Sequence, residues 1–182
     1  SGKNLISYGN TDDSFDWQDG WQGQANTNWY AYQTGTGNFA MEIESKSVNN
    51  AFFPKVSNIT LRRAAGTVTE GGTSAAEYDA IQFKKEGNGE YSNIVISGYT
   101  TTNAVTVRIQ DASTNTNQVD GGKIKLLNVK IADNSPLTGV GATTFTVAFL
   151  PANYTLSATA TGAALTAGNW AIVDGVNLLE KL

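Results

Sequence analysis

The chain has 182 residues, with 16 acidic and 12 basic side chains and a formal net charge of −4. This length suits one domain with a sizeable core, and the acidic balance with scattered basic residues argues against nucleic-acid binding. The chain contains no cysteine and no histidine, which excludes disulfides, thiol nucleophiles, histidine-dependent triads and most zinc sites. No apolar run of about 18 residues occurs, so we expect no membrane span.

Four asparagines each open a short strand-like segment in the same register: Asn4, Asn58, Asn93 and Asn128. The first and third residues after each Asn fall on one face of a strand, because strand side chains alternate. These positions are apolar apart from one serine, and they are Leu5/Ser7, Ile59/Leu61, Ile94/Ile96 and Val129/Ile131. Recurrence at one register is typical of stacked coils with an Asn ladder at a shared bend.

Further alternation of apolar and polar residues predicts strands at 41–44, 81–84, 105–110 and 145–149, separated by glycine-rich turns. The steps between the four asparagines are 54, 35 and 35 residues. The long first step is either one coil with a long excursion or two coils with one Asn missing. We expect residues 45–56 and 64–77 to be loops that leave the stack.

These patterns predict an all-β fold, a right-handed parallel β-helix whose coils occupy residues 1–138. Pro136, Pro151 and the Ala/Thr/Gly-rich stretch 156–168 break the register, and we predict a C-terminal β-rich cap at residues 139–182. The first coil has no such cap, so earlier coils or other copies of the chain are expected at an open N-terminal edge. An antiparallel β-sandwich is the alternative, since it also has short alternating strands and glycine-rich turns.

Two stretches carry a family resemblance. Residues 4–23 contain the pattern N-x-x-x-x-G-N-x-D-D-S-F-D-W, and residues 79–98 contain a strand, a Gly-Asn-Gly corner and an Asn-led strand. Both resemble the C-terminal coils of secreted right-handed parallel β-helix proteins of Bacteroidota-type bacteria, often lipid-anchored or exported. The resemblance covers residues 3–135. It implies the fold and an extracellular or cell-surface location, and little about activity.

An acidic cluster is the first candidate site. Asp12, Asp13, Asp16 and Asp19 lie within eight residues, and carboxylates this close repel unless a cation or hydrogen bonds compensate them. Calcium prefers six to eight oxygen ligands, which Asp-rich turns supply. The cluster therefore suggests a Ca²⁺ site, although the spacing is not that of an EF-hand. The alternative is that these aspartates cap turns or are solvated.

Aromatic residues in a Gly/Gln/Asn-rich segment form the second candidate site. Trp21, Trp29, Tyr30 and Tyr32 lie there, and exposed rings beside amide side chains would stack on sugars and bond their hydroxyls. The alternative is that the rings fold back over the flank of the solenoid as a small core.

Catalytic arrangements are harder to find, and we assign no catalytic residue. Asp12 and Asp16 with Arg62 or Lys84 would suit a Ca²⁺-assisted polysaccharide lyase. A glycoside hydrolase needs paired carboxylates, which Asp16 and a glutamate at 42 or 44 on an adjacent coil would provide. We expect instead a non-catalytic extracellular structural or adhesive module that contacts glycan or other copies of itself. A carbohydrate-binding module and the lyase remain the alternatives.

Overall fold

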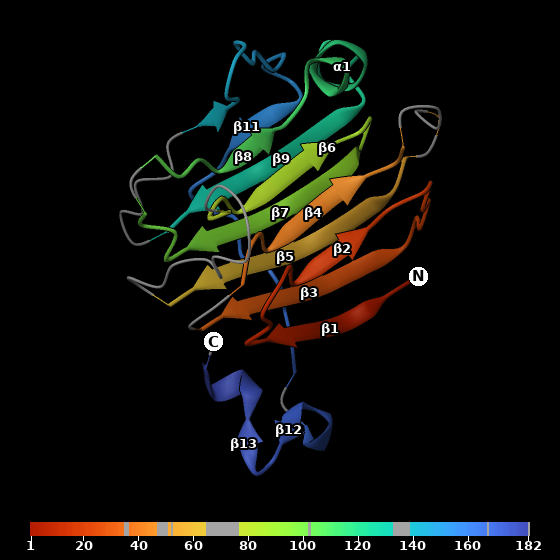
Figure 1. The fold of residues 1–182 in the computed structure, drawn as a ribbon. Coiled ribbons are helices and arrows are strands. Elements are labelled where there is room, and N and C mark those ends of the chain that lie inside the picture. The colour runs from red at the N-terminus through yellow and green to blue at the C-terminus, as the bar shows by residue number, and fades with distance from the viewer. Residues whose placement is uncertain are drawn as a thin grey trace.

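The computed structural model describes residues 1–34, 37–46, 51, 53–64, 77–101, 103–132, 139–166 and 168–181. Its strands form two parallel sheets and a small hairpin (Figure 1). Sheet A comprises, in spatial order, β1 (Lys3–Tyr8), β3 (Asn26–Gln33), β5 (Lys55–Arg63), β7 (Gly89–Ser97), β9 (Ile124–Ile131) and β11 (Tyr154–Leu156). Sheet B comprises β2 (Phe15–Trp17), β4 (Met41–Glu44), β6 (Ile81–Lys84), β8 (Val107–Ile109) and β10 (Val140–Gly141). The remaining elements are α1 (Ala112–Thr114), η1 (Asn115–Val119), η2 (Asn169–Ala171), β12 (Ile172–Val173), β13 (Val176–Asn177) and η3 (Leu178–Lys181).

The chain alternates between the two sheets, so each coil adds one strand to sheet A and one to sheet B. Strand neighbours within both sheets pair in parallel. A β-sandwich has antiparallel sheets, so this pairing rules out the alternative fold. The predicted parallel β-helix is confirmed. Part of the loop predicted at 45–56 and most of the one at 64–77 lie outside the described residues.

The core lies between the two sheets and is built from the inward columns of both. In sheet A, five of the predicted inward side chains belong to the core and are at most 1% exposed. They are Ile59, Leu61, Ile94, Ile96 and Val129. Sheet B contributes Met41, Ile43, Ile81, Phe83, Val107 and Ile109, all fully buried. Leu5, on the outermost strand β1, is 37% exposed, and Ile131 on β9 is only partly buried.

The asparagine ladder contains five members rather than four. Asn4, Asn28, Asn58, Asn93 and Asn128 all have φ between 54° and 59°, the left-handed conformation that Asn tolerates better than most residues. Asn28 Nδ2 donates to Asn4 Oδ1 at 3.0 Å, and Asn93 Nδ2 donates to Asn58 Oδ1 at 2.7 Å. The long first step is therefore two coils, and the Asn between them is present at position 28.

Residues 157–164, which we call the strap, cross the outer face of sheet A along this ladder. The amide of Thr161 donates to Asn93 Oδ1 at 2.8 Å, and that of Ala164 donates to Asn28 Oδ1 at 3.2 Å. Between them, the amide of Ala163 donates to Thr60 Oγ1 at 2.9 Å. The strap thus satisfies its own backbone with the side chains of successive coils and carries the chain back toward β1.

The segment predicted as a C-terminal cap has three parts in the structure. Residues 140–156 continue the solenoid, because β10 pairs with β8 and β11 pairs with β9. The strap follows, and the β12–β13 hairpin then lies next to β1, at the other end of the stack (Figure 1). Val173 and Leu178 line a cavity together with Leu5 and Tyr8 of β1. The β-rich segment predicted to close the C-terminal end therefore reaches the N-terminal edge.

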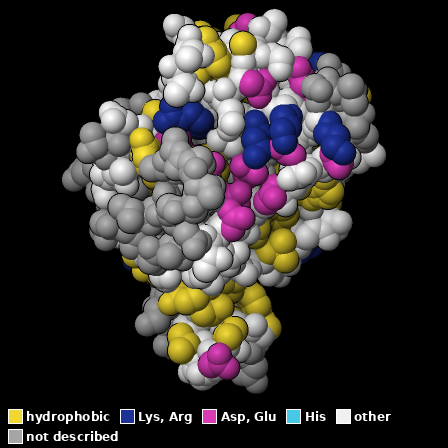
Figure 2. Space-filling model, viewed as in Figure 1, with side chains coloured by type: hydrophobic (Ala, Val, Ile, Leu, Met, Phe, Trp, Pro, Cys, Tyr) yellow, Lys and Arg dark blue, Asp and Glu magenta, His cyan; other side chains and the backbone are white. Residues whose placement is uncertain are grey.

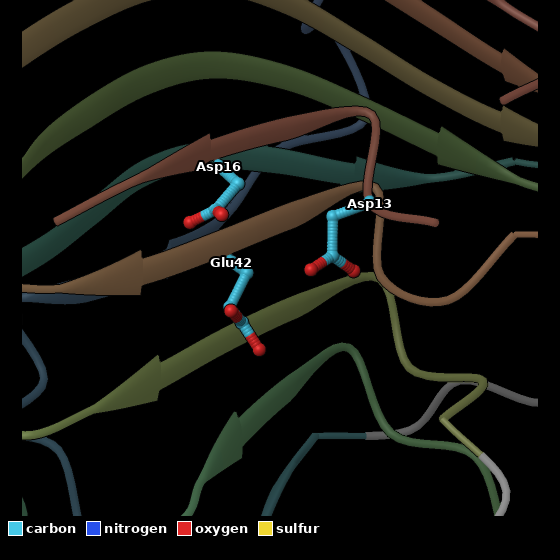
Figure 3. Close-up of side chains that lie close together, drawn as sticks. All are labelled: Asp13, Asp16 and Glu42. Atoms are coloured by element: carbon cyan, nitrogen blue, oxygen red, sulfur yellow. The ribbon is translucent and has the colours of Figure 1, made fainter. Parts of the chain in front are cut away.

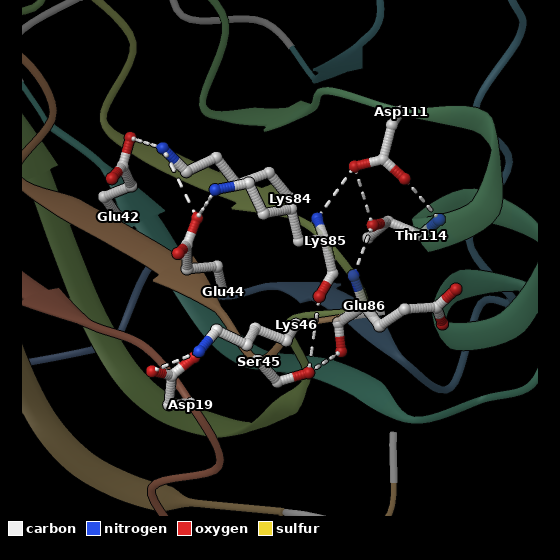
Figure 4. Close-up of polar contacts among 10 residues, drawn as sticks. All are labelled: Asp19, Glu42, Glu44, Ser45, Lys46, Lys84, Lys85, Glu86, Asp111 and Thr114. Atoms are coloured by element: carbon white, nitrogen blue, oxygen red, sulfur yellow. Dashed lines mark hydrogen bonds and ion pairs between the residues drawn. The ribbon is translucent and has the colours of Figure 1, made fainter. Parts of the chain in front are cut away.

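A short helical corner, α1 and η1, joins β8 to β9 and fixes the end of β6. Asp111 caps α1 by accepting the amide of Thr114 at 2.8 Å, and it also accepts the amide of Lys85 at 2.8 Å (Figure 4). Thr114 Oγ1 accepts the amide of Glu86 at 2.8 Å. These bonds hold the two residues that follow β6 in place beside the outer face of sheet B.

Candidate functional site

Charged side chains line the outer face of sheet B. Inward positions alternate with outward ones, and strand register places Asp16, Glu42, Gln82 and Arg108 in one outward column across β2, β4, β6 and β8. Figure 2 shows the corresponding surface, where Lys and Arg side chains lie beside Asp and Glu side chains on one face of the molecule. Each of the four coils from β2 to β8 thus adds one side chain to a single polar stripe.

Three carboxylates converge at one end of this column. Asp13, Asp16 and Glu42, the carboxylate trio, offer ligand atoms that all lie within 4.8 Å of one another (Figure 3). Asp13 precedes β2 and is held by the amide of Phe39, which donates to its Oδ1 at 2.7 Å. Glu42 is buried, Asp13 is half-buried and Asp16 is exposed. The trio is therefore open to solvent on one side.

Burial and mutual repulsion make the trio costly to ionise. Burial, with the charge of Glu42 next, raises the pKa of Asp13 from 3.8 to about 7, against the hydrogen bond from Phe39. Burial also raises the pKa values of Asp16 and Glu42, against the opposing effect of Lys84. Negative charge at this place is therefore only partly compensated by the protein itself.

Two lysines lie on the Glu42 side of the trio, and Figure 4 shows them with Glu42 and Glu44. Lys84 Nζ lies 2.7 Å from Glu42 and 3.6 Å from Glu44, and Lys85 Nζ lies 2.9 Å from Glu44. Burial alone would lower the pKa of Lys84, but the hydrogen bond and charge of Glu42 outweigh it and raise that pKa. Lys84 is thus held as an ammonium group and not as a base.

The same stripe continues into a cleft of about 620 Å³ at its far end, lined by Phe39, Asp79, Gln82, Arg108 and Gln110 among others. Arg108 forms an ion pair with Asp79, with its Nε 2.8 Å from Oδ2. The cleft adds hydrogen-bonding groups and a guanidinium to the face that carries the trio.

The four predicted calcium ligands separate in the structure. Asp13 and Asp16 join the trio, while Asp12 accepts from Asn38 Nδ2 at 2.8 Å. Asp19 lies 2.8 Å from Lys46 Nζ in an exposed ion pair (Figure 4). Sequence reasoning missed the third member of the trio as a metal ligand, because only the register of β2 against β4 brings Glu42 beside Asp16.

The predicted aromatic platform is largely inside the protein. Trp29 is 5% exposed and Tyr30 is 2% exposed, so neither ring has a free face for a sugar. Trp21 is partly buried and stacks 5.8 Å from Trp29, and the half-buried Tyr32 lies under the guanidinium of Arg62 at 5.1 Å. Trp29 belongs to the core between the sheets, whereas Tyr30 is buried on the opposite, outward side of β3. Sugar contact by Trp21 or Tyr32 stays a prediction.

The structure brings together the residues of the hydrolase arrangement but only some of those of the lyase arrangement. Arg62 belongs to β5 of sheet A, whereas Asp16 faces outward from sheet B, so the lyase arrangement with Arg62 is not assembled. Lys84 does lie beside the trio, but as a charged partner of two glutamates. Asp16 and Glu42 are direct register partners on adjacent coils, as the hydrolase arrangement requires.

One comparison with known proteins bears on this site. A family model described as "Pectate-lyase like beta helix domain" matches residues 1–173, which is nearly the whole chain. The chain belongs to this family. No curated protein and no solved structure matches it. A pectate-lyase-like β-helix thus presents the carboxylate trio, two lysines and the Asp79–Arg108 cleft on one sheet face. Within the described part of the chain, no helix is long and apolar enough to cross a membrane.

The trio suits a calcium ion by its chemistry. Calcium takes oxygen ligands at about 2.3–2.6 Å, so two oxygens on one ion lie at most about 5 Å apart. The atoms of the trio fall within that limit. Three carboxylates would leave several of the six to eight coordination positions to water or to an oxygen-rich ligand.

Proposed function

We propose that the outer face of sheet B binds an acidic polysaccharide through a calcium ion held by Asp13, Asp16 and Glu42, without cleaving it. The convergence of these three carboxylates on one open face carries the proposal. A bound cation would relieve the burial and repulsion that raise the pKa of Asp13. Its remaining coordination positions would suit the carboxylate of a uronic acid.

Binding without cleavage is favoured by the state of the neighbouring cations. Elimination from a uronic acid needs a group that accepts a proton. Lys84 is tied to two glutamates and Arg108 to Asp79, with Nζ–Oε1 and Nε–Oδ2 distances of 2.7 and 2.8 Å. These groups are better suited to position an anionic ligand. The proposal makes the protein an adhesive module, and with the resemblance to secreted β-helix proteins we place it outside the cell or at its surface.

Calorimetric titration with CaCl₂ tests the cation site. The unchanged protein should bind calcium, Glu42→Gln should weaken binding by roughly tenfold or more, and Asp19→Asn should match the unchanged protein. Asp19 is the matched control because it also removes one carboxylate from the same segment, outside the trio. If Glu42→Gln and Asp19→Asn weaken calcium binding equally, only the overall charge matters, and the calcium site at the trio is refuted.

Retention on immobilised polygalacturonate tests the ligand. Calcium should increase retention, and EDTA or Glu42→Gln should remove that increase. Ultraviolet absorbance of unsaturated products is followed in the same samples. If this absorbance appears when calcium is added and is lost in Lys84→Gln, the protein cleaves the polysaccharide, and the lyase alternative replaces the binding proposal.

A further inference from the structure

A second polar groove lies on the outer face of sheet A, near the beginnings of its strands. It is a cavity of about 420 Å³ lined by Lys3, Lys55, Ser57, Glu90 and Ser92 among others. Two outward columns form its floor. Lys55, Glu90 and Lys125 are register partners in the first, and Thr27, Ser57 and Ser92 are register partners in the second. We call this feature the lysine groove.

Positive charge is concentrated in the lysine groove although the whole chain is acidic. The Nζ atoms of Lys55 and Lys125 each lie 5.9 Å from the centroid of the same ring, Phe53. Glu90 also lines the groove, and its carboxylate lies 3.9 Å from Lys125 Nζ. Neither Lys3 nor Lys55 takes part in an ion pair within the described ranges. Lys3, Lys55 and Lys125 together outnumber the one acid between them, Glu90, and leave positive charge that an anion would neutralise.

The second column supplies hydroxyl groups at the spacing of neighbouring strands. Thr27, Ser57 and Ser92 lie on β3, β5 and β7, so their side chains repeat at about 4.8 Å across the sheet. Ser57 Oγ is 3.1 Å from Thr27 Oγ1, which shows that the column points to one side. Hydroxyls can both donate and accept, as the hydroxyls of a sugar ring do.

We propose that the lysine groove binds an anionic saccharide directly, with the ammonium groups of Lys3 and Lys55 on its carboxylate or sulfate ester and the serines on its ring hydroxyls. No metal ion takes part, because the groove supplies the positive charge itself. The site is separate from the carboxylate trio, which faces outward from the other sheet. Each β-helix module therefore has two faces for acidic glycan, one dependent on calcium and one independent of it.

The two sites are separated by working in EDTA. Retention on polygalacturonate and on chondroitin sulfate is measured in EDTA at low salt, with neutral dextran as the uncharged comparison. Some retention should persist without calcium on at least one of the acidic matrices. Lys55→Gln should weaken it by several-fold, and Lys3→Gln combined with Lys55→Gln by roughly tenfold or more. Melting temperatures of all variants confirm that each is folded.

Lys46→Gln is the matched control, since it removes the same charge from an exposed lysine paired with Asp19. An equal loss in Lys46→Gln and Lys55→Gln would reduce the groove to a general charge effect and overturn the proposal. So would complete loss of retention in EDTA, or equal retention on DNA-cellulose, which would identify a general polyanion surface. Carbohydrate type is then assigned by which acidic matrix retains the protein.

Failure of the calcium proposal would look different. Glu42→Gln and EDTA would then have no effect on glycan binding, while the lysine variants would still reduce it. Calcium-dependent binding should persist in the Lys3→Gln/Lys55→Gln protein, because the trio is separate from the lysine groove. Retention in EDTA that is unchanged in this protein would overturn the lysine groove and leave the calcium proposal standing.

Discussion

Asp13→Asn is expected to stabilise the protein at neutral and alkaline pH when calcium is absent. The asparagine keeps an oxygen for the amide of Phe39, which donates to Asp13 Oδ1 at 2.7 Å, and it removes the negative charge. A pKa moved from 3.8 to about 7 corresponds to about 4 kcal/mol between the neutral and charged carboxyl. Asp13 is partly exposed, so solvent screening reduces this figure to about 2 kcal/mol.

The sign of the pH dependence follows from the direction of the shift. The folded protein holds the Asp13 proton more tightly than the unfolded chain, so ionising Asp13 costs nothing below about pH 3.8 and its full amount above about pH 7. The unchanged protein therefore loses this stability across that window and the variant does not. For a chain of this size, about 2 kcal/mol corresponds to about 4–8 °C in melting temperature.

Thermal unfolding in EDTA at pH 4 and pH 8 measures the effect. The variant should melt higher at pH 8 and close to the unchanged protein at pH 4, with Asp19→Asn showing no comparable gain. Added calcium should raise the melting temperature of the unchanged protein more than that of Asp13→Asn. A lower melting temperature for Asp13→Asn at pH 8, or the same gain at both pH values, would refute the reasoning.

Three further predictions concern the strap and the tryptophans. Asn93→Ala loses the side-chain hydrogen bonds to Thr161 and Asn58 and places alanine at φ 54°, so it should lower the free energy of unfolding by about 2 kcal/mol. Asn93→Gly, which loses the same hydrogen bonds without the backbone strain, should cost about half as much in urea titration. Gly162→Ala would place a methyl group 2.3 Å from a threonine oxygen at φ +70° and should speed hydrogen exchange in the strap; unchanged exchange would mean that the strap is not held there. Trp170→Phe should remove most iodide-quenchable fluorescence, because Trp170 is 50% exposed and Trp29 5%; quenching equal to that of the unchanged protein would contradict this placement.

The sequence allowed the fold to be predicted because each coil repeats a strong local signal. Asn at a bend, followed by apolar residues one and three positions later, needs no knowledge of distant contacts. The ladder position of Asn28 could not be predicted from the spacing. The coils before Asn58 are shorter than the later ones, so no fixed period reaches position 28, and the aromatic Trp29 and Tyr30 that follow it differ from the aliphatic residues that follow Asn58, Asn93 and Asn128.

The candidate site could be predicted only in part. Asp13 and Asp16 are neighbours in sequence, but Glu42 joins them through the register of β2 against β4, which the sequence does not state. Burial of Tyr30 on the outward side of β3 was equally hidden, because outward positions of a sheet are usually exposed. The strap left no periodic signal, since most of its bonds to the coils use its backbone amides and only Thr161 adds a side-chain contact, with Asn93.

The course of the strap has a consequence for how the solenoid unfolds. In a stack where each coil touches only its neighbours, the terminal coils can fray while the middle stays folded. Here the segment that follows the last coil is bonded to β7, β5 and β3 in turn. Detaching the first coils therefore also detaches part of the chain that follows β11. This linkage should merge the separate steps of an open repeat array into a single cooperative transition.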